Sequence, residues 1–125
     1  MIDHVSITVS DLARSTAFYE ALLGTLGFTK LADRKTTKGF GKKYPEFWLN
    51  VRKGESVPSG THVALRASSV EAVKAFHKAA LENGGTCDGP PDFREIYNPS
   101  YYAAFIQDPE GNRIEAVTFV EDGKN

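Results

Sequence analysis

The chain has 125 residues, enough for one domain spanning 1–125 but too few for two independent cores. Its 15 basic and 16 acidic residues give a net charge of −1, so no whole-molecule field favours nucleic acid or an anionic membrane. No apolar run approaches the roughly 20 residues that cross a bilayer, and the chain opens on a strand pattern rather than a signal peptide. With a single cysteine and therefore no internal disulfide, we expect a cytoplasmic protein.

The sequence repeats itself. The segment that begins at His4 aligns without a gap on the segment that begins at His62, an offset of 58 residues. Two further kinds of residue fall in the same register, Ser10 on Ser68 and Gly27 on Gly85. Such a repeat predicts two modules of one fold: module one at 1–55, a linker at 54–60 and module two at 61–120.

Module one reads as a strand, a helix and then further strands. Apolar and polar residues alternate in its predicted strands, at 3–9, 28–33 and 46–52. A helical stripe of large apolar residues follows the first strand, with Ser10 or Asp11 as its N-terminal cap and Gly27 at its end. Six basic residues gather in the hairpin region: Lys30, Arg34, Lys35, Lys38, Lys42 and Lys43. We interpret this stretch as a solvated hairpin, and a basic flap over an anionic ligand is the alternative.

Module two repeats the pattern, with strands predicted at 61–67, 101–107 and 113–119. Its helix follows Ser68 or Ser69 and ends near Gly85. The buried stripe of that helix is expected to be Val70, Val73, His77, Ala80 and Leu81. The residues at 108–112, DPEGN, are a strong turn signal between the last two strands.

Strand side chains alternate between two faces, which places His4, His62 and Glu115 opposite the residues expected to pack on the helices. If each half is a curved sheet, these faces line one cavity. Two imidazoles and one carboxylate form a facial set that suits Fe(II), Mn(II), Ni(II) or Zn(II) and leaves positions for water or substrate. A structural role for each residue is the competing interpretation, but the recurrence of the histidine in both halves favours ligation.

Seven more residues are predicted to line a substrate pocket on the same face: Ser6, Thr8, Trp48, Asn50, Arg66, Tyr101 and Phe105. Arg66 is either a ligand for a carboxylate or phosphate or a solvated rim charge. Trp48 is either a stacking wall or core filling, and Tyr101 either orients a substrate oxygen or packs in the core. No general base is identifiable beyond the metal ligands themselves.

The motifs at 4–19 (HVSITVSDLARSTAFY), 26–28 (LGF), 62–65 (HVAL) and 108–115 (DPEGNRIE) resemble the glyoxalase, bleomycin-resistance and dioxygenase superfamily, the vicinal oxygen chelate proteins. The resemblance covers nearly the whole chain. It implies an α+β fold of two βαβββ modules forming a curved, barrel-like mixed sheet around a metal-bearing cavity. It also implies a homodimer, with the cavity formed within one chain or across two.

By this resemblance His4, His62 and Glu115 are the family's metal ligands. The fourth ligand of glyoxalase I-like members falls on Trp48, so the four-ligand set lacks a member. Phe105 stands where extradiol dioxygenases have an acid–base tyrosine, and its side chain can neither donate nor accept a proton.

We therefore expect a metal-dependent, glyoxalase-like enzyme acting on a small substrate with vicinal oxygens by lyase, isomerase or thiol-transfer chemistry. Dioxygenase activity ranks lower. The alternative is a metal-free protein that sequesters a small molecule or antibiotic, as bleomycin-resistance proteins do. A small-ligand sensor with a vestigial site is the third possibility.

Overall fold

The computed structural model describes residues 1–52 and 61–120; the predicted linker at 54–60 lies outside the described residues. Module one comprises β1 (Val5–Thr8), α1 (Leu12–Gly24), β2 (Thr29–Asp33), β3 (Thr37–Gly41) and β4 (Pro45–Asn50). Module two comprises β5 (His62–Arg66), α2 (Val70–Glu82), β6 (Thr86–Phe93), β7 (Tyr101–Gln107) and β8 (Arg113–Phe119). The expected pair of βαβββ modules is confirmed.

Each module has its own four-stranded sheet, in the order β1-β4-β3-β2 or β5-β8-β7-β6. The first and last strands of a module pair in parallel, and the other pairs are antiparallel. Ser6 lies opposite Trp48 in module one, and Ala64 lies opposite Glu115 in module two. Because Ser6 and Ala64 are equivalent in the 58-residue repeat, Trp48 occupies the place in module one that Glu115 occupies in module two.

The helices begin where short polar side chains can accept hydrogen bonds from the first turn. Asp11 accepts from the Arg14 N–H at 3.0 Å, and Ser69 accepts from the Ala72 N–H at 3.1 Å. After α1 the chain turns at Gly27, whose φ of 85° is a left-handed conformation that a side chain would disfavour. Both N-terminal caps are as the sequence predicts, but α1 ends at Gly24 with Thr25 as its C-terminal cap, so Gly27 lies in the turn after the helix rather than at the cap.

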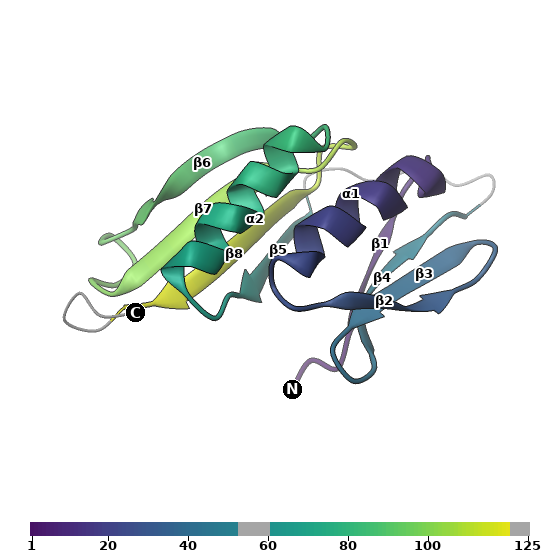
Figure 1. Ribbon diagram of the computed structural model, residues 1–125, viewed down its shortest axis with the longest axis horizontal. Helices are drawn as coiled ribbons and strands as arrows, with labels where there is room; N and C mark the ends of the chain where they lie inside the picture. Colours follow the sequence, from purple (N-terminus) through teal and green to yellow (C-terminus); the bar gives the residue numbers. More distant parts are fainter. Residues whose placement is uncertain (53–60, 121–125) are drawn as a thin grey trace.

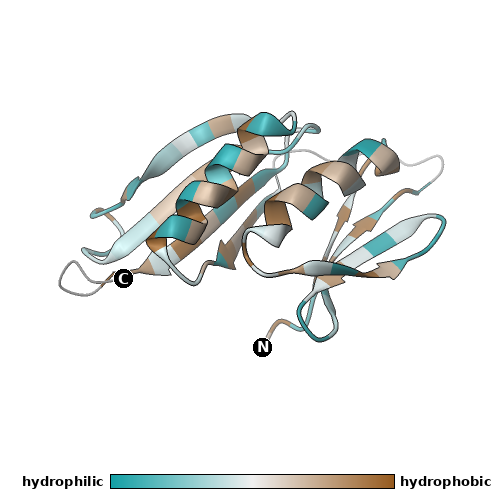
Figure 2. Cartoon of the chain, in the orientation of Figure 1, coloured by the Kyte–Doolittle hydropathy of each residue, from teal (hydrophilic) through white to brown (hydrophobic). Residues whose placement is uncertain are grey.

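Each helix packs on one face of its own sheet, and the two helices lie side by side while the sheets remain separate (Figure 1). Hydrophobic and hydrophilic residues alternate along both helices (Figure 2). In α2 the buried residues are Val73, Phe76 and Ala80, whereas Leu81 is 45% exposed. The prediction of Leu81 in the buried stripe was therefore wrong, and Phe76 was missed. No helix in the described part of the chain is long and apolar enough to span a membrane.

Strand β6 was not predicted, because its sequence contains Asp88, Gly89, Pro90 and Pro91, all of which disfavour strands. It is an edge strand, so the two prolines remove no hydrogen bond from a second neighbour. Its pairing with β7 shifts register on both sides of Gly89, as at a β-bulge. Figure 2 shows β6 coloured mostly in hydrophilic shades, as suits an exposed edge.

The turn at 108–112 of module two joins the two modules. Asp108, only 4% exposed, accepts a hydrogen bond of 2.6 Å from the Tyr19 hydroxyl of α1. The carboxylate of Glu110 accepts from the N–H groups of Ser10 at 2.7 Å and Asp11 at 3.0 Å. A side chain of module two therefore binds the free N–H groups at the start of α1.

Candidate functional site

A buried carboxylate lies on the open face of the module-two sheet, opposite α2. Glu115 in β8 is 2% exposed, and its Oε1 lies 2.9 Å from Nε2 of His62 at the start of β5. The Tyr101 hydroxyl donates a hydrogen bond to Oε2 of the same carboxylate. A buried carboxylate is costly unless it is paired, so His62 and Tyr101 together stabilise the charge and fix its orientation.

Tyr101 acts as a hydrogen-bond donor in this arrangement. Burial raises the pKa of its phenol well above the ordinary value, and the hydrogen bond to Glu115 raises it further. The group therefore stays protonated at neutral pH and cannot serve as a base there. Its neighbour Tyr102 faces the other way and is only 7% exposed, and its ring centroid lies 5.1 Å from that of Phe93 at the edge of the sheet. Sequence parity predicted these opposite orientations.

The module-two pocket, of about 380 Å³, opens beside this pair and is lined by His62, Asp88, Gly89, Arg94, Tyr97, Phe105 and Arg113. The Arg94 guanidinium lies 5.4 Å over the Phe105 ring, and its Nη2 donates to the Pro90 carbonyl at 2.6 Å. Arg113 lies 3.8 Å from the carboxylate of Asp88. Of the two guanidinium groups, the one of Arg113 is thus partly neutralised.

The module-one pocket, also of about 380 Å³, is lined by His4, Ser6, Arg34, Thr37, Trp48, Asn50 and Arg52. Asn50 donates to the Ser6 hydroxyl and accepts from the Thr37 hydroxyl at 2.6 Å. The Arg34 guanidinium lies 5.6 Å over the Trp48 ring. Thr8 pairs with Asn50 on the neighbouring strand. Within one chain the predicted pocket residues are thus divided between two open faces.

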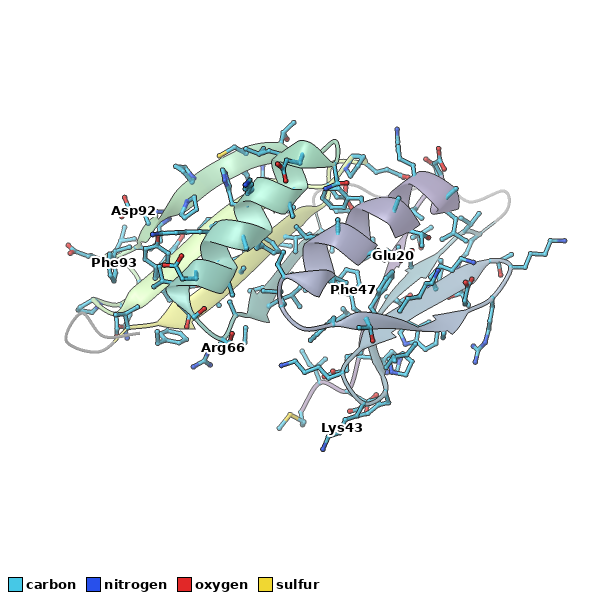
Figure 3. The ribbon with its side chains drawn as sticks, in the orientation of Figure 1. Glu20, Lys43, Phe47, Arg66, Asp92 and Phe93 are labelled. Atoms are coloured by element: carbon cyan, nitrogen blue, oxygen red, sulfur yellow. The ribbon has the colours of Figure 1, made fainter. Side chains whose placement is uncertain are left out.

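His4 does not join Glu115 within one chain. Its Nδ1 lies 2.8 Å from a carboxylate oxygen of Asp3. His4 and His62 both line a third hollow of about 570 Å³ where the modules meet, together with Arg66. Figure 3 shows Arg66 at the end of β5, on the side away from the helices. In residues 1–52 and 61–120, no three His, Cys, Asp or Glu side chains are gathered closely enough to hold a metal ion.

Sequence reasoning missed several of the arginines that line these pockets. Arg52 follows Asn50 by two residues, and Arg113 precedes Glu115 by two, so strand alternation already placed each on the open face. Arg34 and Arg94 lie outside the strands, where the direction of a side chain depends on the turn. Stacking of both on aromatic rings had no signal in the sequence.

Two βαβββ modules, each with a histidine at or immediately before the start of its first strand, define the paired-module architecture that the motifs predicted. A family model described as the Glyoxalase/Bleomycin resistance protein/Dioxygenase superfamily matches residues 1–116. The chain belongs to this superfamily.

Solved structures agree with this assignment. A glyoxalase/bleomycin resistance protein from Albidiferax ferrireducens T118 is 36% identical with a TM-score of 0.84, over 92% of this chain and 96% of that one. The fosfomycin resistance protein FosX from Mesorhizobium loti shares the fold at 17% identity, with a TM-score of 0.68 over 96% of this chain and 92% of its own. A glyoxalase I mutant from Zea mays is 24% identical with a TM-score of 0.68, over 91% of this chain but 44% of its own. Comparison with curated proteins found no significant match.

Proposed function

We propose that this protein is a metal-dependent, glyoxalase-like enzyme that acts on a small substrate with vicinal oxygens. The observation that carries the proposal is the buried carboxylate of Glu115 facing Nε2 of His62 at 2.9 Å on an open sheet face. A structural glutamate of this burial would be expected to face a basic side chain inside the core. Here the partner imidazole is half-exposed, with 53% of its side chain accessible, so the pair is open to a ligand.

The donor set suits a divalent ion. Imidazole nitrogen and carboxylate oxygen each bind such an ion at about 2.0–2.2 Å, so two neighbouring ligands of one ion lie roughly 3 Å apart. The separation of 2.9 Å between His62 and Glu115 matches this. The hydrogen bond from Tyr101 to the other carboxylate oxygen would hold Glu115 in one orientation, as outer hydrogen bonds commonly do for ligating carboxylates.

A third ligand, His4, would come from a second copy of the chain. The two sheets of one chain are separate, so the open face of each module is free to meet the other module of a partner. In a two-fold symmetric dimer this contact would form twice, giving two equivalent sites. Large exposed side chains next to the module-two pocket, Ile96 at 90% and Tyr97 at 64%, support such a contact.

A divalent ion held by His4, His62 and Glu115 would supply Lewis-acid chemistry, stabilising negative charge that develops on a substrate oxygen. Tyr101 stays protonated and orients Glu115, while Phe105 contributes an apolar wall beside His62 at a ring distance of 6.2 Å. Lyase, isomerase and thiol-transfer reactions are all compatible with these roles. A metal-free protein that sequesters a small molecule is the competing function.

Metal content tests the proposal. Tag-free protein should carry about one divalent ion per chain by elemental mass spectrometry, and His4→Ala and His62→Ala should each lose it. His77 is the third histidine of the chain and lies on α2, so His77→Gln is the matched control and should keep the ion. If no ion binds after incubation with Fe(II), Mn(II), Ni(II) and Zn(II), the enzyme proposal fails and the sequestration function is favoured.

A further inference from the structure

The module-one pocket has an unusual charge. Its described lining residues include two arginines, Arg34 and Arg52, and no acidic side chain. We propose that these two guanidinium groups bind an anionic group of the substrate, a carboxylate or a phosphate-like group. The inference deepens the proposed function and rests on it, because His4 lines the same pocket and would connect the anion site to the metal.

Arg34 is held in position from two sides. Its backbone N–H donates to the Thr37 carbonyl at 3.0 Å, and its guanidinium stacks over the Trp48 ring at 5.6 Å. Trp48 in turn lies close against the backbone of β3, because a Cβ at Gly39 would be 2.8 Å from the indole. A guanidinium that lies over an aromatic ring keeps its N–H groups, which can make a planar, two-oxygen contact with an anion.

The acidic residues that adjoin the pocket residues in sequence, Asp33 and Asp3, already have partners other than the two arginines. Asp33, adjacent to Arg34, forms ion pairs with Lys38 and, at 3.1 Å, with Lys30. Asp3, adjacent to His4, forms a hydrogen bond to that imidazole at 2.8 Å. Within the described ranges, neither pocket arginine forms an ion pair with an acidic side chain. Their positive charge is therefore available to a ligand.

Three polar strand residues form the floor of the pocket, and hydrogen bonds link them to one another, so the arginines are the groups that would bind the anion. The Thr37 hydroxyl donates to the side-chain oxygen of Asn50 or to the Leu49 carbonyl, and Asn50 donates to the Ser6 hydroxyl. These bonds fix the floor, so it need not reorganise when a ligand enters. A pocket of about 380 Å³ also lies within the range of roughly 300–1,000 Å³ that small-molecule sites occupy.

Trp48 makes the inference directly measurable, because it is the one tryptophan of the chain. Its fluorescence would be followed while chelator-treated, metal-free protein is titrated with inorganic phosphate or, separately, with oxalate, at constant ionic strength set by chloride. We expect a saturable change with at least one of the two anions. Arg34→Gln and Arg52→Gln should each raise the Kd about tenfold or more, the loss expected for a charge-assisted contact.

Lys43→Gln is the matched control. Lys43 is an exposed cation in the turn between β3 and β4 and projects away from the body of module one (Figure 3), so its removal should leave the Kd unchanged. The anion that saturates identifies the preferred group: phosphate-like if only phosphate responds, carboxylate if only oxalate responds. A response no larger than that to chloride, or one equal in Arg34→Gln, Arg52→Gln and wild type, would overturn the inference.

The two proposals fail separately. Because the titration uses metal-free protein, an anion response that depends on the arginines supports this inference even if no metal binds at His62 and Glu115. A protein that binds metal but gives no arginine-dependent response keeps the metal proposal and loses the anion site.

Discussion

Module one and module two have the same strand order and the same helix position, yet their open faces carry different chemistry. The place that holds Glu115 in module two holds Trp48 in module one. Module two thus presents a carboxylate with its imidazole, and module one presents a histidine with an arginine stacked on an indole. The comparison teaches that the repeat fixes the scaffold, while single positions on it divide the chemistry between the halves.

We expect the largest loss of stability from a variant that breaks the buried hydrogen bond between the two modules. Asp108→Ala removes the partner of the Tyr19 hydroxyl and of the Asn112 N–H, bonds of 2.6 and 2.9 Å in a buried setting. Leaving these donors unsatisfied should lower the free energy of unfolding by about 3 kcal/mol. Chemical denaturation would measure the change.

The control is Asp88→Ala, at a partly exposed carboxylate whose arginine partner lies 3.8 Å away. It should change the stability by less than about 0.5 kcal/mol. Equal losses in the two variants would mean that the buried contact between the modules is unimportant.

The second prediction compares two glycines that lie against aromatic rings. A Cβ at Gly39 would lie 2.8 Å from the Trp48 ring and 2.9 Å from Pro45, whereas a Cβ at Gly89 would lie 3.0 Å from the Phe105 ring. Gly39→Ala should therefore cost about 2 kcal/mol of unfolding free energy, and Gly89→Ala clearly less. Parallel thermal melts would measure both, and a larger loss in Gly89→Ala would show that the module-one face is the more adaptable one.

The third prediction restores the symmetry between the modules. Trp48→Glu places a carboxylate where module two has Glu115, and in the proposed dimer it would add a ligand to the metal site. The affinity for a divalent ion should rise about tenfold, which is about 1.4 kcal/mol. Titration calorimetry would measure it, with Trp48→Gln as the uncharged control. Equal affinities in the Glu and Gln variants would contradict the equivalence of the two places as ligand positions.

The smallest effect concerns the two helix starts. Burial alone would raise the pKa of Glu110, but hydrogen bonds from the Asp11 and Ser10 N–H groups, then from side chains, outweigh it and lower that pKa. Because the folded pKa lies below the ordinary 4.5, the stabilisation is full above that value and is lost as pH falls through the folded pKa. Glu110→Gln should cost about 1 kcal/mol at neutral pH and less in acid.

Glu71→Gln is the counterpart at the start of α2, where the carboxylate is 85% exposed. It should leave stability nearly unchanged at either pH. A cost for Glu110→Gln that did not shrink on acidification would show that shape rather than charge matters at that position.

The repeat allowed much of the fold to be predicted. An offset of 58 residues aligned His4 with His62, and strand alternation then placed Glu115 and Tyr101 on one face. Strand β6 was missed because its stability as an edge strand comes from pairing with β7, which local composition does not encode.

Contacts between the modules could not be predicted from the sequence, for a similar reason. Glu110 meets Ser10 across 100 residues, and the position of one module on the other is set by packing that no local pattern describes. The stacking of Arg34 on Trp48 likewise depends on the turn that precedes β3 and on the space left by Gly39. Residue types and faces could be predicted, but not which of them come together.

The central claim, that a second copy completes the site, is tested most directly by mixing two variants that each lack one metal ligand. His4→Ala retains His62 and Glu115, and His62→Ala retains His4, so neither variant alone should bind the ion. After the two are unfolded and refolded together, half of the dimers should be mixed, each with one intact site, which restores roughly a quarter of the wild-type metal. A mixture that binds no more metal than its two components would contradict the account and place all three ligands in one chain.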